Sequence, residues 1–271
     1  MASAGYIYLG ASPYALRILR ELVARSASRP LCLIDVGLDD ARRRALADEL
    51  GGAVRAEHIH DAACLRDPAF LARLRAAAPA LALSAHFSQL LSPDFLAIPR
   101  HGVANLHSGL LPYNRGHWPE IWSIVRGTPA GITLHLIGEG IDTGDVIDQQ
   151  AAPVRPEDTC ASLAATLEEL GVELVLRNWE AMLTGDARAQ PQAQRLPLNL
   201  HKHVEQLAEI HLERKYTGKE LIDLLRALTL PRLLKGAFFV DPDTGDRIRL
   251  QLTLTRESAA ADPALRLEQT P

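Results

Sequence analysis

Apolar runs alternate with amphipathic segments along the first 110 residues of the chain. Each run ends at a glycine, a proline or a polar residue and predicts a buried strand. After the first run, Ala15, Ile18, Leu19 and Leu22 keep the spacing of one helix face. This alternation predicts an α/β fold with a mostly parallel, doubly wound sheet. The predicted strands cover residues 6–9, 30–36, 80–85 and 102–107, and the predicted helices cover 12–25, 39–50 and a segment that begins at Asp67-Pro68.

After residue 130 the pattern becomes more typical of antiparallel pairing, because apolar and polar positions alternate over residues 130–137. Gly185 lies just beyond a long amphipathic segment and suits a left-handed C-terminal helix cap. The predicted elements of this half are strands over 130–137 and near 145–150, helices over 159–183 and 217–228, and two strands that flank the turn at 241–246.

Clusters of proline, glycine and polar residues mark segment boundaries and divide the chain into four parts. We expect a first domain over 1–190, a polar linker or covering segment over 191–200, a small α+β module of helix and β-hairpin over 201–255, and a tail over 256–271.

The composition is that of an ordinary globular protein, with 47% hydrophobic and 23% charged residues among 271. The net charge is −4, so the chain has no excess of positive charge that would attract a polyanion. We therefore do not expect a nucleic-acid partner. No apolar run approaches the roughly 20 residues that span a bilayer, so we expect no membrane partner. Three scattered cysteines, Cys32, Cys64 and Cys160, predict reduced thiols and a cytoplasmic protein.

Three side chains are candidates for chemistry at a carbonyl group: Asn105, His107 and Asp142. Asn105 and His107 lie two residues apart at the end of a predicted strand, so their side chains project from the same face. An amide or an imidazolium can stabilise an oxyanion, and histidine moves protons near neutral pH. Asp142 follows His107 by 35 residues and could hold the imidazole in one tautomer. Taken alone, such a trio is more often a structural polar cluster than a catalytic site.

Other chemistries fit the sequence less well. Ser108 lacks the Gly-x-Ser-x-Gly context of a nucleophile elbow. The histidines form no pair with recognised ligand spacing, so no metal site is predicted. The turn at Gly10 lacks the further glycines of a dinucleotide fingerprint and the lysine of a P-loop. Two tryptophans flank Pro119; we expect Trp122 in the core and Trp118 partly exposed, where it could stack on a substrate ring.

Three motifs in order make the trio more specific. They are Asn105-Leu-His107-Ser-Gly-Leu-Leu-Pro-Tyr-Asn-Arg-Gly116, Trp122-Ser-Ile-Val-Arg-Gly-Thr-Pro-Ala-Gly-Ile-Thr-Leu-His135 and Gly140-Ile-Asp142-Thr-Gly-Asp-Val-Ile147. Together they resemble the formyltransferase family, which includes glycinamide ribonucleotide transformylase, methionyl-tRNA formyltransferase and the nucleotide-sugar N-formyltransferases. The resemblance is strong over residues 84–150 and looser over the first 80. One departure is Gly109, where the family usually has proline or serine, and it affects the predicted shape of that turn.

The resemblance implies a Rossmann-like formyltransferase core, N10-formyltetrahydrofolate as formyl donor and a primary amine as acceptor. It implies that Asn105, His107 and Asp142 are catalytic. Asn105 and protonated His107 would stabilise the tetrahedral oxyanion, and Asp142 would shuttle the amine proton toward the departing folate nitrogen. It also implies that folate lies beside the strand ends, held by Gln89, Leu90, Leu91, Ile137, Gly138, Glu139, Gly140 and Ile141.

The acceptor is less defined by the sequence. The flanks of the first motif and the segment near residue 225 are most similar to nucleotide-sugar N-formyltransferases, which implies a nucleotide-linked amino-deoxysugar and a homodimer. Candidate acceptor-binding residues are Ser108, Tyr113, Arg115 and Trp118. The alternatives are an amino-acid, hydroxyornithine or peptide amine, methionyl-tRNA, water as acceptor in a hydrolytic reaction, or an inactive folate-binding module.

Overall fold

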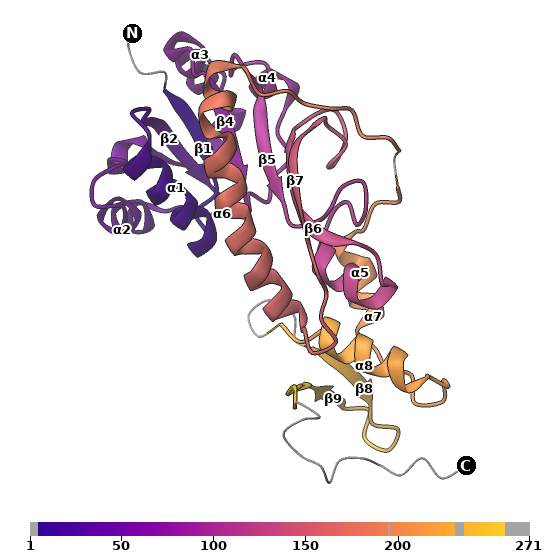
Figure 1. The fold of residues 1–271 in the computed structure, drawn as a ribbon. Helices are drawn as coiled ribbons and strands as arrows, with labels where there is room; N and C mark the ends of the chain where they lie inside the picture. The colour runs from indigo at the N-terminus through magenta and orange to yellow at the C-terminus, as the bar shows by residue number, and fades with distance from the viewer. Residues whose placement is uncertain (1–4, 195, 231–235, 258–271) are drawn as a thin grey trace.

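The computed structural model describes residues 5–194, 196–230 and 236–257. A seven-stranded sheet forms its centre, with the strand order β3-β2-β1-β4-β5-β6-β7 (Figure 1). The first five strands in this order pair in parallel, whereas β5 with β6 and β6 with β7 pair antiparallel. The strands are β1 (Tyr6–Leu9), β2 (Pro30–Asp35), β3 (Ile59–Asp61), β4 (Leu81–Ala85), β5 (Val103–His107), β6 (Ala130–Leu136) and β7 (Val146–Ala152). The predicted α/β fold with a mostly parallel sheet is confirmed.

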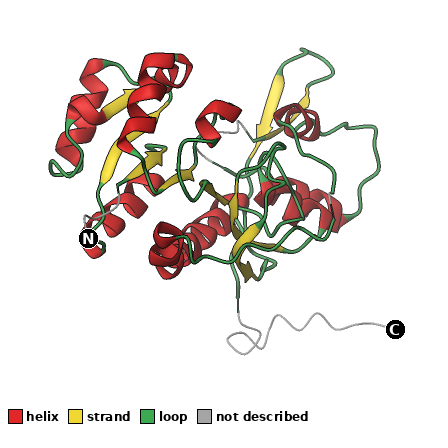
Figure 2. Cartoon of the chain, turned by 90° about the horizontal axis from the view of Figure 1, so that it is seen from above, coloured by secondary structure: helices red, strands yellow, loops and turns green. Residues whose placement is uncertain are grey.

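Helices cover both faces of this sheet, as seen from above in Figure 2. One buried cluster joins α1 and α6 to β1 and β5, and a second cluster joins α3 and α4 to the opposite face. The helices of the first domain are α1 (Pro13–Arg25), α2 (Asp40–Glu49), α3 (Pro68–Ala77), α4 (Pro93–Leu96), α5 (Pro119–Arg126) and α6 (Cys160–Thr184), with short 3-10 turns at Ala56–His58 and Ala62–Arg66.

Local sequence signals set the boundaries of these helices. The Ser12 side chain caps α1 by accepting a hydrogen bond from the Ala15 N–H, and Pro13 occupies the first turn. Thr159 and Ser162 form a capping box at the start of α6. Gly185 ends α6 with φ +83°, the left-handed cap predicted from the sequence. These signals explain why the ends of the long helices were predicted to within a residue or two.

The small C-terminal module packs at one end of α5 and α6 (Figure 1). It contains α7 (His201–Leu207), α8 (Gly218–Ala227) and a hairpin of β8 (Ala237–Val240) and β9 (Arg247–Leu250). The sequence did not predict α7 or α4, and the second strand of the hairpin ends at Leu250. Most of the predicted tail lies outside the described residues.

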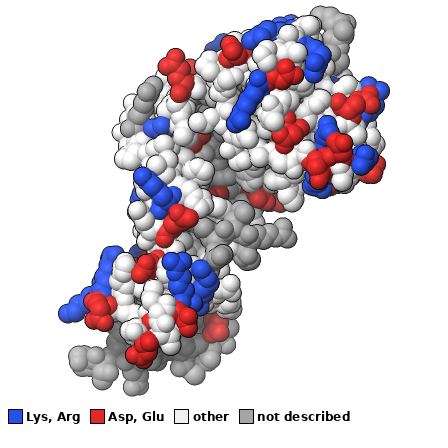
Figure 3. Space-filling view, turned by 180° about the vertical axis from the view of Figure 1, so that it is seen from behind, with Lys and Arg blue, Asp and Glu red and all other residues white. Residues whose placement is uncertain are grey.

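In the described part of the chain, no helix combines the length and apolarity that a membrane crossing requires. On the face drawn in Figure 3, positive and negative side chains lie interspersed over both the sheet domain and the C-terminal module. The carboxyl ends of β1 and β4 diverge into different crossovers, so they form a topological switch point, where α/β sheets commonly bind ligands.

Candidate active site

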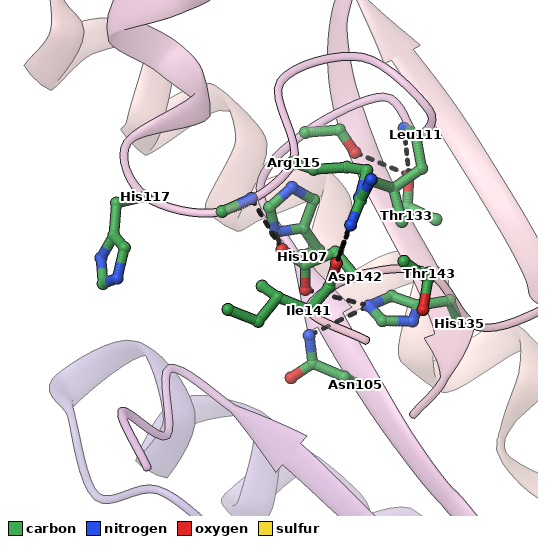
Figure 4. A network of polar contacts seen from close by, with 12 residues as sticks. Asn105, His107, Leu111, Arg115, His117, Thr133, His135, Ile141, Asp142 and Thr143 are labelled. Atoms are coloured by element: carbon green, nitrogen blue, oxygen red, sulfur yellow. Dashed lines mark hydrogen bonds and ion pairs between the residues drawn. The ribbon is translucent and has the colours of Figure 1, made fainter. Parts of the chain in front are cut away.

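Strand β5 supplies the first two side chains of the site. Ala104 and Leu106 point into the core beneath α1 and α6, so Asn105 and His107 project from the other face. Asp142 approaches them from the loop between β6 and β7, where it adopts a left-handed φ of +51°. Figure 4 shows the three side chains converging from these two segments. The structure therefore brings together the trio that the sequence singled out.

The Asp142 carboxylate lies between two imidazole rings. Its Oδ2 is 3.6 Å from Nδ1 of His107, and its Oδ1 is 3.6 Å from Nε2 of His135. The Gly116 N–H donates to Oδ2 at 2.8 Å. The side chains of His107 and Asp142 are 8% and 13% exposed, so water screens this contact only weakly.

His135 is a member of the cluster that the sequence did not identify as functional. Its Nδ1 lies 2.8 Å from the Leu136 carbonyl, which can only accept, so Nδ1 carries the proton. The Asn105 amide then donates to His135 Nε2 at 3.2 Å, and Ser84 Oγ donates to the Asn105 oxygen at 2.8 Å. This chain of bonds fixes the orientation of the Asn105 amide and leaves its second N–H available to a ligand. The signal that sequence reasoning lacked is the antiparallel register, which pairs Asn105 with His135.

Burial and the neighbouring groups shift the pKa values of both His107 and Asp142. Burial lowers the pKa of His107, although Asp142 partly opposes this, so the ring is neutral at neutral pH. Burial raises the pKa of the Asp142 carboxyl, but His107, His135 and the Gly116 N–H outweigh it and hold that pKa well below its usual range. Burial thus disfavours the imidazolium that the sequence analysis expected at His107, whereas the Asp142 carboxylate favours it.

Gly109 leaves space beside His107. A Cβ at this position would lie 2.7 Å from His107 Nε2 and 3.1 Å from Pro119 Cβ. The Nε2 atom is buried and has no hydrogen-bond partner in the described structure. The departure at Gly109 thus affects the packing around the imidazole, and it keeps an unpartnered nitrogen free of a neighbouring side chain.

The candidate donor-binding segments converge near the ends of β4 and β6. Leu91 and Ile137 are partly buried against the same apolar cluster, while Leu90 is 83% exposed. Gln89 is partly buried, and the loop residues Gly138, Gly140 and Ile141 are partly buried beside the exposed Glu139. Exposed apolar surface next to loop backbone groups suits a flat heteroaromatic ring.

The four candidate acceptor residues lie in the loop after β5 but differ in availability. Ser108 is partly buried and bonds to the carboxyl of Glu120. Trp118 is partly buried, with its indole N–H unpartnered, and Tyr113 is also partly buried. Arg115 is buried, and its guanidinium donates to the carbonyls of Ile141 and Leu196. Its geometry thus favours a role in holding the Asp142 loop over direct contact with a substrate.

Glu120 was not identified from the sequence, although it is 8% exposed. Burial, with a smaller contribution from the nearby Glu168, raises the pKa of its carboxyl to about 7. Among the residues that the structure describes, no group of three or more His, Cys, Asp or Glu side chains could hold a metal ion.

Comparisons with known proteins find a family model over each of the two parts of the chain. A family model described as formyl transferase matches residues 38–178, and a model described as N-formyltransferase dimerization C-terminal domain matches residues 203–256. Methionyl-tRNA formyltransferase of Geobacter sulfurreducens is 31% identical over 189 residues, which are 68% of this chain and 60% of the relative. The dTDP-4-amino-4,6-dideoxyglucose formyltransferase of Mycobacterium tuberculosis is 35% identical over 156 residues, 58% of this chain and 66% of the relative.

The chain therefore spans slightly less than two thirds of the length of these curated relatives. Among solved structures, a 4-N formyltransferase from Francisella tularensis has a TM-score of 0.81 at 23% identity. The match covers 94% of this chain and 99% of that one, so the two share a fold that includes the C-terminal module.

Proposed function

Because the chain belongs to the formyl transferase family, we propose that it transfers a formyl group from N10-formyltetrahydrofolate to the primary amine of a nucleotide-linked amino-deoxysugar. The observation that carries this proposal is the buried cluster of Asn105, His107, His135 and Asp142, which lies inside the segment matched by the family model. An ordinary structural cluster has no need for an unpartnered ring nitrogen at His107 or a spare amide N–H at Asn105.

The proposed mechanism assigns a different task to each side chain. Bound folate supplies a formyl carbonyl next to a nitrogen leaving group. Asn105 donates its free N–H to the carbonyl oxygen, where negative charge develops. His107, neutral at the start, accepts the proton of the attacking amine on Nε2 and later returns it to the leaving nitrogen. Asp142 faces Nδ1 and stabilises the imidazolium that forms.

His135 acts through its neighbours in this mechanism. By accepting the Asn105 N–H on Nε2, it fixes the orientation of the amide beside the Asp142 carboxylate. We therefore assign it a positioning role.

For the acceptor, the named activity of the M. tuberculosis relative supports an amino sugar. The net charge of −4 and the interspersed surface charges argue against a large polyanion such as tRNA. We further propose a homodimer formed through the C-terminal module, because residues 203–256 match the model described as N-formyltransferase dimerization C-terminal domain. Free cysteines, two of them buried, fit a reducing compartment such as the cytoplasm.

The test is a panel of acceptors offered together with N10-formyltetrahydrofolate. We expect tetrahydrofolate to be released with nucleotide-linked amino sugars, and at a far lower rate with amino acids, hydroxyornithine or methionyl-tRNA. Asn105→Ala should lower turnover on the order of 100- to 1000-fold, the effect of removing one oxyanion donor.

Each other outcome of this panel has a distinct meaning. Activity confined to another amine class would overturn the acceptor assignment. Formate release without any amine would replace transfer by hydrolysis. Folate binding without consumption by any member of the panel would leave only a binding module.

A further inference from the structure

The segment that was predicted to be a polar linker has specific contacts with the active site. We define the strap as residues 190–194 and 196–199, which run from the end of α6 past the β6–β7 loop to α7 (Figure 1). At its start, Gln190 exchanges two backbone hydrogen bonds of 2.8 Å with Val146. At its end, the Asn199 N–H donates to Arg115 O, and Asn199 O accepts from the His117 N–H. The strap is therefore fastened at both ends.

Between these anchors, Gln192 reaches the loop that carries Asp142. Its Nε2 donates to the carbonyl of Asp142 at 2.9 Å and to the carbonyl of Gly144 at 2.8 Å. Its Oε1 is buried without a partner. The amide cannot turn over, because the reversed orientation would place Oε1 against two carbonyl oxygens.

The same loop is held from its other side by the segment after β5. Arg115 donates to Ile141 O through two nitrogens, at 3.1 and 2.7 Å, and to Leu196 O of the strap at 2.9 Å. Gly116, at φ +90°, donates to the Asp142 carboxylate, and a Cβ there would collide with Asn199 of the strap. Three carbonyls of the loop and one carboxylate oxygen are thus bound by groups from outside the loop.

These contacts are needed because Asp142 is in an unfavourable conformation. A left-handed φ of +51° is disfavoured for a residue with a Cβ, and such a conformation persists only when the surroundings impose it. We propose that Gln192 is a positioning residue that holds the Asp142 carboxylate between His107 and His135, so that the strap completes the active site. This inference rests on the proposed formyl transfer for its kinetic consequences, but its structural part does not.

The test compares Gln192→Met, which keeps the length and removes the N–H donors, with Gln194→Met on the exposed part of the same strap. We expect Gln192→Met to lower kcat on the order of 10- to 100-fold, as small misplacements of catalytic groups do, with little change in the KM of the donor. The titratable groups that face His107 are Asp142, His135 and Arg115. Of these three groups, only Asp142 raises the pKa of His107. A loosened Asp142 should therefore let the pKa of His107 fall, and the limb of the pH profile that reports His107 should move to lower pH. Gln192→Lys keeps an N–H donor and should recover much of the loss.

A second readout separates this inference from the proposed function. Hydrogen exchange of the peptide spanning residues 137–145 should accelerate in Gln192→Met and not in Gln194→Met, whether or not the protein transfers formyl groups. Equal exchange and equal kcat in the two variants would overturn the positioning role. Inactivity of the wild type with every amine, together with accelerated exchange in Gln192→Met, would refute only the proposed function.

Discussion

Replacing Asp142 by asparagine tests the charge at the centre of the site with little change in shape. Asparagine tolerates a left-handed φ, and its side-chain oxygen can still accept from the Gly116 N–H, so the loop should keep its conformation. What the variant lacks is the negative charge 3.6 Å from His107 Nδ1. At an effective dielectric constant of about 20, that charge stabilises an imidazolium by roughly 4–5 kcal/mol, or about 1000-fold in rate.

We therefore expect Asp142→Asn to lower kcat about 1000-fold, measured in single-turnover reactions with the best acceptor of the panel. The matched control is Asp145→Asn, in the same loop but exposed and, in the described part of the chain, without an ion pair to an imidazole. The kcat of Asp145→Asn should stay close to that of the wild type. An Asp142→Asn enzyme within tenfold of the wild type, or no more impaired than Asp145→Asn, would refute the role of the carboxylate.

Two further substitutions probe the packing beside His107 and the buried carboxyl of Glu120. Gly109→Ala would place a Cβ 2.7 Å from His107 Nε2, so the ring or the turn must shift, and kcat should fall on the order of 100-fold. An unchanged kcat would show that the site can accommodate this Cβ. Glu120→Gln tests burial of a carboxyl whose pKa is raised from 4.5 to about 7. Because this pKa is raised, the wild type should lose stability as pH rises from about 4.5 through 7, by about 3 kcal/mol, while Glu120→Gln should not. The gap between their melting temperatures should widen from pH 5 to pH 8, and a constant gap would contradict the burial effect.

The sequence predicted the parts of this site that depend on local periodicity. Asn105 and His107 were placed on one face because a strand repeats every two residues, and the structure agrees. His135 was missed because its partnership with Asn105 depends on the register between two strands, which no local pattern encodes. The position of Asp142 beside His107 came from resemblance to a family and could not be obtained from spacing alone.

Polar residues misled the sequence analysis for a related reason. Gln192 lies in a stretch whose composition predicts a linker, but its hydrogen bonds join a side chain to distant backbone carbonyls, and composition carries no information about such contacts. Glu120 was overlooked because carboxylates are usually exposed, and only the packing of α5 shows it to be buried.

The path of the strap affects where this protein can be divided or fused. A cut after residue 190 would keep all seven strands of the sheet but remove Gln192, Leu196 and Asn199, which bind the loop of Asp142 and the segment beside it. A chimaera that exchanges C-terminal modules should therefore be joined at residue 200, just before α7, so that each sheet domain keeps its own strap. By this criterion the functional boundary lies about ten residues beyond the boundary that composition suggests.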